Sequence, residues 1–493
     1  MTPSAQPLVD LVRRVLAERG VAGWLVGGIV RDALLGRDTA DVDVLVDADA
    51  HTAAEWLLAA ARAEPMPSHT GFACLDQDWG VYRVVIGDAT IDVVPLEGSL
   101  EEELLRRDIT INALAVPIGS ELADIIDVSG GLPDLAARVA RTFRSSNLSD
   151  DPVRLLRVAR FAVELDLTVE PQTAEWVRGL GCLLGQAPGE RIARELLATL
   201  DSPRAAALPE VLEGLGLADA VLPELASLRG IGRFGFHHLD AYEHSMETYA
   251  FVAAALSGES EPPGVGAELW SSMIEVVSGE PLPGVRARRA IVLLAALLHD
   301  VGKPSCMAQD DDGRVRFVGH ERAGGEIARQ VAARLRLSRL ETAHLAALAE
   351  HHMRPCMLGS TEEPPTARAC ARVFRLLLAR TPDVCLLALA DRAASRGPAS
   401  TPEVVRRQME ATARVLELWL AERKREPEGR PLVTGRDLMT HLGISGGPII
   451  GRILTELGVA EAAGELHDRD AALALARELM ADMRSDGPDG GDA

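Results

Sequence analysis

Two aspartates in the run DVDVLV, Asp41 and Asp43, are separated by one residue. The β-branched residues around them predict a strand over 42–46, and alternate residues of a strand point to one face. Two carboxylates on one face suit Mg²⁺, which binds a few carboxylates together with substrate phosphates. Asp92, in a second strand pattern over 91–94, is a candidate third carboxylate. The pattern therefore predicts a metal-binding carboxylate pair, with solvated aspartates on an edge strand as the alternative.

A glycine pair precedes these aspartates. Gly27 and Gly28 stand where a predicted strand over 24–26 meets a helix that begins near Ile29. Glycines let backbone N–H groups approach a phosphate closely, and a helix N-terminus adds its positive end. Arg31, one turn into the helix, offers a guanidinium to the same phosphates. The order GG-x-x-RD and then DxD is more specific than either part, and it predicts nucleotidyl transfer with metal ions that activate a hydroxyl and hold a triphosphate.

The segments LVGGIVRDALLG (25–36) and DVD (41–43) resemble the class II tRNA nucleotidyltransferase and bacterial poly(A) polymerase family. Further blocks follow in the family's order: RRDITINA (106–113), Asp127 with GGLPDL (130–135), and DDPVRLLRVARF (150–161). The likeness covers most of residues 20–480. It implies an enzyme that adds nucleotides to an RNA 3′ end.

The first of these further blocks implies nucleotide and ribose recognition by Arg107, Asp108 and Asn112. Only residues 95–105 separate the block from the preceding strand, whereas many CCA-adding relatives carry a longer loop there. A short connection also occurs in relatives that add only the two cytidines. The sequence is therefore consistent with both CCA addition and CC addition.

The last block implies a protein template for the incoming base. Asp151 accepts hydrogen bonds and Arg154 donates them, and we expect a helix to hold them one turn apart. Such a pair could accept the edges of C and A while leaving U or G with unmatched groups. Arg157 and Arg160 follow on the same face as candidates to hold triphosphate or the RNA end, and Asp150 stands where the family has Glu. A charged helix face with Asp–Arg pairs is the alternative.

A second group of residues has metal-ligand chemistry. The run HDVGKP (299–304) follows an apolar helix pattern over 293–298, and imidazole with carboxylate suits Zn²⁺, Fe, Mn²⁺ or Ni²⁺. The order His, His-Asp, Asp resembles the HD phosphohydrolase superfamily, which implies the metal ligands His244, His299, Asp300 and Asp391. Secondary candidates for a second metal or for phosphate are Lys303, His320, His351 and His352. We expect Ni, Mn, Fe, Zn or Mg²⁺ there, with a structural module that supports tRNA docking as the alternative.

The composition fits a globular protein of several domains. The chain has 493 residues, 47% of them hydrophobic, and a net charge of −22, which argues against bulk attraction to nucleic acid. Six arginines between 138 and 160 predict a local basic surface. The scattered cysteines, the lack of a long apolar run and the lack of a signal-peptide core predict a cytoplasmic protein with no membrane span.

The element patterns predict an α+β fold: a nucleotidyltransferase head with a small mixed β-sheet, then an all-α neck, an HD domain and a C-terminal helical tail. Strands are predicted over 24–26, 42–46, 82–86 and 91–94, and 113–116 and 124–127 extend the sheet. Residues 257–283 are predicted to be a loop, and 422–429 a charged linker. The domain limits are 20–145, 146–230, 231–400 and 401–480, and 481–493 is expected to be a disordered tail.

These observations together predict a tRNA nucleotidyltransferase that adds C and/or A from CTP and ATP to the tRNA 3′ end, with Mg²⁺ on Asp41 and Asp43. An HD phosphohydrolase activity is a possible addition. The alternatives are a CC-adding enzyme, a poly(A) polymerase, or a protein whose real activity is HD hydrolysis. The sequence gives no indication of the oligomeric state.

Overall fold

The computed structural model describes residues 3–63, 69–77, 80–232, 238–260, 264–311, 315–425 and 432–485. They form two compact units, the first containing residues 1–196 and 210–221, and the second containing 197–209 and the chain from 222 onward. None of the helices that the structure describes combines the length and apolar character that a membrane span requires.

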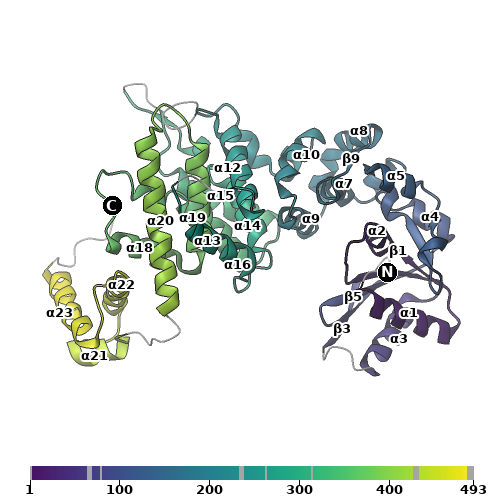
Figure 1. Ribbon diagram of the computed structural model, residues 1–493, viewed down its shortest axis with the longest axis horizontal. Coiled ribbons are helices and arrows are strands. Elements are labelled where there is room, and N and C mark those ends of the chain that lie inside the picture. Colours follow the sequence, from purple (N-terminus) through teal and green to yellow (C-terminus); the bar gives the residue numbers. More distant parts are fainter. Residues whose placement is uncertain are drawn as a thin grey trace. The chain divides into compact units, whose positions relative to one another are not determined.

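Seven strands of the first unit form one mixed sheet in the order β3-β4-β5-β2-β1-β6-β7. The labelled strands β1, β3 and β5 mark this sheet in Figure 1. The strands are β1 (Gly23–Val26), β2 (Asp41–Val46), β3 (Thr70–Asp76), β4 (Val81–Ile86), β5 (Ala89–Pro95), β6 (Leu114–Pro117) and β7 (Ile126–Asp127). β2 and β5 run parallel, and the other neighbouring pairs run antiparallel. This sheet and the helices that follow confirm the predicted α+β class.

The α-helices up to residue 221 are α1 (Gln6–Arg19), α2 (Gly28–Leu34), α3 (Ala50–Ala63), α4 (Leu100–Leu105), α5 (Gly131–Ala137), α6 (Ser146–Ser149), α7 (Val153–Leu165), α8 (Pro171–Leu180), α9 (Gly189–Asp201), α10 (Leu208–Gly214) and α11 (Ala218–Val221). Two short strands, β8 (Val139–Ala140) and β9 (Thr168–Val169), form a small parallel pair among them.

The alternation of residues in β2 decides which face of the sheet carries the carboxylates. The three valines of β2 are fully buried in an apolar core shared with α1 and α3. Because neighbouring strand residues point to opposite faces, Asp41 and Asp43 lie on the face away from α1 and α3. The hydrophobic pattern of this strand thus positions the candidate site.

The second unit is helical almost throughout. Its α-helices are α12 (Ala241–Leu256), α13 (Ala267–Gly279), α14 (Arg288–Leu298), α15 (His320–Arg334), α16 (Arg339–His351), α17 (Arg354–Met357), α18 (Ala367–Leu377), α19 (Thr381–Ala394), α20 (Pro402–Arg425), α21 (Gly435–Leu442), α22 (Pro448–Ala462) and α23 (Arg469–Ser485). Capping boxes begin α12, α16 and α21. A two-stranded pair, β10 (Ala308–Gln309) and β11 (Val315–Arg316), precedes α15.

The last three helices form a small C-terminal module, residues 432–485. Its apolar core cluster consists of side chains between Leu432 and Met483. The module therefore has a hydrophobic core of its own, as an independent folding unit does.

Several predicted elements differ from the structure. The prediction of a loop over 257–283 is wrong, because α13 occupies its second half. Strand β3 was not predicted, and the expected strand over 124–127 shortens to the two residues of β7. The tail predicted over 481–493 begins too early, because α23 continues to Ser485, and residues 486–493 lie outside the described residues. The linker predicted over 422–429 overlaps the end of α20. Its residues 426–429 lie outside the described residues.

Candidate functional site

The carboxylate pair lies on β2, next to the parallel strand β5. Asp41 is exposed and accepts a hydrogen bond from Thr90 Oγ1 at 2.8 Å, while Asp43 is half-buried opposite Asp92 in the sheet register. Burial raises the pKa of Asp43, and the nearby Arg107 guanidinium offsets this only in part. A bound cation favours the ionised carboxylate, so the pair fits the divalent metal that the sequence predicts.

Gly27 lies where β1 meets α2 and has a left-handed φ of +73°. A Cβ atom at this position would lie 2.7 Å from Arg107 Nη1 and 3.2 Å from Asp43 Oδ2. Glycine is therefore required both by the backbone conformation and by the close approach of these two side chains. The α2 N-terminus, Asp43 and Arg107 thus share one small region.

Asp92 lies on the same face of the sheet as Asp43, as the sequence suggested for a third carboxylate. Its two carboxylate oxygens accept hydrogen bonds from Arg83 Nε and Nη2, both at 2.7 Å. Arg83 directly faces Asp92 across the antiparallel pair β4–β5. Arg83 was not predicted as a site residue, although two strands joined by a tight turn give a register in which the pairing could be found.

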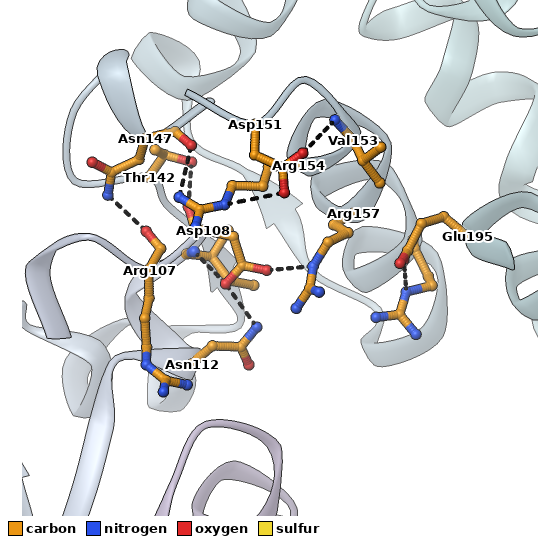
Figure 2. A network of polar contacts seen from close by, with 12 residues as sticks. Arg107, Asp108, Asn112, Thr142, Asn147, Asp151, Val153, Arg154, Arg157 and Glu195 are labelled. Carbon is orange, nitrogen blue, oxygen red and sulfur yellow. Dashed lines mark hydrogen bonds and ion pairs between the residues drawn. The ribbon is translucent and has the colours of Figure 1, made fainter. Parts of the chain in front are cut away.

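Arg31 and the RRDITINA block meet in a buried hydrogen-bond network (Figure 2 shows its Asp108, Asn112 and Arg157). Arg31 Nη1 donates to Asn112 Oδ1 at 2.6 Å, and its other nitrogens bind Asp32. Asn112 Nδ2 donates to Asp108 Oδ1 at 3.1 Å, and Arg157 Nε donates to Asp108 Oδ2 at 2.8 Å. Burial alone raises the pKa of Asp108, but the charge of Arg157 and the hydrogen bond from Asn112 contribute to holding it well below its usual range.

The predicted base-template pair has partners within the protein. Asp151 precedes α7 rather than lying on it, and its carboxylate accepts two hydrogen bonds from Arg191, at 3.0 and 2.7 Å. Arg154 Nη1 donates to the carbonyls of Arg106 and Asn147, at 2.7 and 2.9 Å, and its Nε lies 3.8 Å from Asp151 (Figure 2). Arg191, on α9, was not predicted as a site residue.

The remaining arginines of the block are also paired. Arg160 Nε lies 2.8 Å from Glu195 Oε2, and its guanidinium stacks on Phe161, with the charged carbon 4.5 Å from the ring centre. Asp150 is exposed at the end of α6. Side-chain hydrogen bonds or ion pairs hold all six arginines that predicted a basic surface, namely 138, 141, 144, 154, 157 and 160. Carboxylates face four of them, Arg141, Arg154, Arg157 and Arg160, whereas Arg138 and Arg144 bond to a backbone carbonyl and to an amide oxygen.

The second unit gathers the predicted metal ligands from four helices. His244 comes from α12, His299 and Asp300 follow α14, His352 follows α16, and Asp391 lies on α19. His244 Nε2 lies 2.9 Å from Asp391 Oδ1, and His299 Nε2 lies 3.3 Å from Asp300 Oδ2. Two sets have ligand atoms close enough to share one ion: His244 with His299 and Asp391, and His299 with Asp300 and His352.

The orientation of the histidine rings suits metal binding. The Nδ1 atoms of His299, His320 and His352 each lie 2.8–2.9 Å from a backbone carbonyl three residues earlier. When Nδ1 donates its proton to that carbonyl, Nε2 presents a lone pair to the centre. Burial lowers the pKa of His352 to about 4, which keeps this imidazole neutral, as a ligand must be. His299 Nε2 is buried without a hydrogen bond among the described residues, which also fits a metal ligand.

The secondary candidates separate into two groups. Lys303 Nζ lies 2.5 Å and His320 Nε2 3.3 Å from the carboxylate of Asp300, so both belong to the centre. The sequence left His351 and His352 as alternatives, and the structure places only His352 there. His351 accepts a hydrogen bond from Arg354 Nε at 3.0 Å on the outside.

Comparison with known proteins agrees with this geometry. Three family models match the chain: the poly A polymerase head domain over residues 23–141, the probable RNA and SrmB-binding site of polymerase A over 166–228, and the HD domain over 241–395. The fold and the site thus define a metal-dependent nucleotidyltransferase that carries an HD domain.

Curated relatives identify the family within this class. The chain is 38% identical over 448 residues to the A-adding tRNA nucleotidyltransferase of Deinococcus radiodurans, covering 90% of this chain and 92% of that one. It is 35% identical over 456 residues to the CC-adding tRNA nucleotidyltransferase of Thermus thermophilus, covering 91% and 92%. The chain belongs to the tRNA nucleotidyltransferase family.

Solved structures show the same fold. The Thermotoga maritima CCA-adding enzyme, solved in complex with tRNA, aligns with a TM-score of 0.57 at 19% identity, covering 98% of this chain and 96% of that one. A CCA-adding enzyme solved with ATP aligns with a TM-score of 0.60 at 19% identity. At this level of identity the likeness concerns the fold alone.

Proposed function

We propose that this protein transfers C and/or A nucleotides from CTP and ATP to the 3′ end of tRNA, with Asp41 and Asp43 as the catalytic metal ligands. The observation that carries the proposal is the carboxylate pair on the face of β2 away from α1 and α3, with the Gly27 turn and Arg107 beside it. The names of the relatives, which are A-adding and CC-adding enzymes, support this substrate class.

The proposed reaction is a displacement at phosphorus. The 3′-hydroxyl oxygen of the RNA attacks the α-phosphate, the bond to the β-phosphate breaks, and pyrophosphate leaves while the hydroxyl gives up its proton to solvent. Bound Mg²⁺ supplies charge that activates the hydroxyl and stabilises the leaving group. Asp41 and Asp43 hold the metal, and the N-terminus of α2 and Arg107 bind triphosphate oxygens.

We assign nucleotide selection to the neighbouring network. Asp108 and Asn112 are proposed to position the ribose, and Asp151 and Arg154 to match the edge of the base. In the structure, Asp151 and Arg154 bond to Arg191 and to backbone carbonyls. An incoming base must therefore exchange with these partners, so that a base with the wrong edge leaves them unsatisfied.

A CC-adding enzyme is the second candidate. The observation that favours it is the short connection between β5 and Arg106, whose second half is the helix α4, fixed by a capping box between Ser99 and Glu102. This leaves little chain for a long loop near the nucleotide.

Extension of three tRNA transcripts tests the proposal and the candidates. The transcripts lack CCA, CA or only A, and each is incubated with CTP, with ATP, and with both. Addition of C, C and A in turn indicates a CCA enzyme, a stop after two cytidines indicates CC addition, and extension of only the third transcript indicates A addition. Long A-tracts on any RNA indicate a poly(A) polymerase. No extension of any transcript would overturn the proposal.

We also propose that the HD centre binds a transition metal (Ni, Mn, Fe or Zn) or Mg²⁺ and hydrolyses phosphoesters. His244, His299, Asp300 and Asp391 are the proposed ligands, and Lys303 and His320 face phosphate or a second metal. The test compares His299→Ala with His351→Ala, whose ring faces away from the centre. We expect His299→Ala alone to lose bound metal and hydrolysis of bis(p-nitrophenyl) phosphate. Equal metal content in both variants would contradict the proposal.

We retain as a proposal the division of the chain into four domains with limits at residues 145, 230 and 400, because the proposed activities fit it. The tRNA substrate also leads us to propose a cytoplasmic location.

A further inference from the structure

Helix α18 carries a row of arginines on the side opposite its buried apolar face. Arg368, Arg372 and Arg375 are spaced by four and three residues, so their side chains project from one side of the helix. The row extends over about 10 Å at the usual helical rise. We call these three residues the arginine stripe.

Two glutamates of the C-terminal module pair with the first two arginines of the stripe. Arg368 donates to Glu456 Oε2 at 3.1 Å and to Glu465 Oε2 at 2.9 Å, and Arg372 donates to the same oxygen of Glu456 at 3.2 Å. Partial burial alone raises the pKa of Glu456, but the hydrogen bonds from Arg368 and Arg372 outweigh it and lower that pKa. One carboxylate thus serves two arginines.

The third arginine makes a different contact. Arg375 donates to Glu422 of α20 at 2.7 Å, and its guanidinium also packs against α22 at Gly458. A Cβ atom at Gly458 would lie 3.8 Å from Arg375 Cζ. This is an ordinary van der Waals separation, so α22 packs directly against the Arg375 guanidinium at this position.

Ion pairs form part of the contact between the module and the stripe. The hydrophobic core of the module draws its side chains from the module itself. The ion pairs are partly hydrated, because the side chains of Arg372 and Glu465 are 57% and 44% exposed, whereas those of Arg368 and Glu456 are 28% and 27% exposed. Such exposed pairs contribute little free energy each and are weakened by salt. A competing polyanion can therefore displace the glutamates.

We propose that the arginine stripe binds an RNA phosphate backbone, and that Glu456 and Glu465 occupy it when no RNA is bound. This inference rests on the proposed function, which makes tRNA the substrate. A guanidinium recognises phosphate with the same paired donors that it uses for carboxylate. RNA gains further from the release of its counterions, which the glutamates cannot match. In a chain of net charge −22, the two glutamates also keep other anions from binding to the arginine stripe.

The experiment measures binding of a fluorescent tRNA transcript to the full chain by anisotropy. The variant Glu456→Gln/Glu465→Gln removes the competitors. The control, Asp470→Asn/Glu478→Gln, removes the same charge from exposed positions of α23 in the same module. We expect roughly three- to tenfold tighter binding for the first variant relative to the control, because competing ion pairs of this size are lost.

A second variant tests the stripe itself. Adding Arg368→Gln/Arg372→Gln to the first variant is expected to abolish the gain in affinity. It should also reduce the slope of log affinity against log salt by about 1.5, since two phosphate contacts are lost.

Two results would overturn the proposal. One is binding of the Glu456→Gln/Glu465→Gln variant no tighter than that of the control, as expected if the contact only fastens the module to α18. The other is a gain in affinity for heparin without a gain for the tRNA transcript, which would exclude RNA as the specific partner. Nucleotide transfer is assayed separately, so that failure of the proposed function would appear as absent transfer by the wild type.

Discussion

Gly27 shows how one residue can decide the geometry of the head site. Its φ of +73° is strained for any other residue, and a Cβ would lie 2.7 Å from Arg107 Nη1. Gly27→Ala must therefore displace Arg107 or Asp43, and displacements of about 1 Å can cost about a hundredfold in rate. We expect kcat/KM for nucleotide transfer to fall by about that factor.

Gly36→Ala is the matched control for this prediction. Gly36 has a φ of +67°, close to that of Gly27, but no atom lies within 4 Å of the Cβ position. The control shares the positive φ without the clash, and a non-glycine residue held at such a φ costs about 1–3 kcal/mol. Similar kcat/KM values for the two variants would show that the crowding at Gly27 has no catalytic consequence.

Residue types and spacing predicted the members of both candidate sites but not their partners. Asp41 and Asp43 could be assigned to one face because strand alternation is local. Arg83 and Arg191, which bind Asp92 and Asp151, come from other elements, so the fold decides these pairs. The same reason left His351 and His352 as alternatives, since only the packing of α16 determines which ring points inward.

At the scale of elements, Glu341 connects the start of α16 to the segment before α14. Its buried carboxylate accepts hydrogen bonds from Arg286 and Ser338. Burial alone raises the pKa of Glu341, but these bonds lower it from 4.5 to about 2. Because the folded pKa is depressed, this stability is present above about pH 4.5 and is lost as the pH falls toward 2.

Glu341→Gln is therefore expected to lower the free energy of unfolding at neutral pH and to flatten its decline between pH 5 and pH 2. Urea unfolding across this pH range measures both effects. Glu363→Gln, on an exposed loop, is the control. A decline as steep in Glu341→Gln as in the control would refute the assignment.

A second buried polar contact ties the helices of the HD domain together. Arg288 Nε donates to Asp383 at 2.9 Å, and His344 Nε2 lies 3.2 Å from the same carboxylate. His344 and Asp383 each lie eight residues, about two helical turns, before His352 and Asp391 of the metal centre. The pair His344–Asp383 thus joins α16 and α19, and two turns further on, at the end of α16 and within α19, lie the residues of the metal centre.

Asp383→Asn leaves the buried Arg288 charge without its counterion and is expected to cost about 3–5 kcal/mol of unfolding free energy. Urea unfolding provides the measurement. The double variant Arg288→Met/Asp383→Leu, which removes both charges, should be less destabilised than Asp383→Asn. A cost below about 1 kcal/mol for Asp383→Asn would count against this interpretation.

The elements that the sequence analysis missed have weak local patterns. Strand β3 (TGFACLD) lies at the edge of the sheet and is mostly exposed, so its sequence lacks the alternation of a half-buried strand. Helix α13 stands between Gly- and Pro-rich segments, which dominated the prediction for 257–283. Its buried Trp270, Met273, Val276 and Val277 show the helical spacing that a narrower window could have found.

For the whole molecule, the distribution of charge matters more than its sum. Four of the six arginines between 138 and 160, namely 141, 154, 157 and 160, pair with carboxylates of the first unit, and the basic surface that their number predicts stays a prediction. The arginine stripe lies on α18, where Glu456 and Glu465 pair with its first two arginines. Counting charges along the chain could not show which arginines pair with carboxylates and which carboxylates they meet, because pairing depends on the tertiary structure.

The most direct test of the central claim is nucleotide transfer to the three tRNA transcripts by Asp41→Asn and Asp43→Asn, beside the wild type. His299→Ala serves as the control, because it alters the HD centre and leaves the head intact. We expect both aspartate variants to lose about 10³-fold or more in kcat, while His299→Ala keeps its transfer activity. Near wild-type transfer by either aspartate variant would contradict the assignment of the catalytic centre to β2.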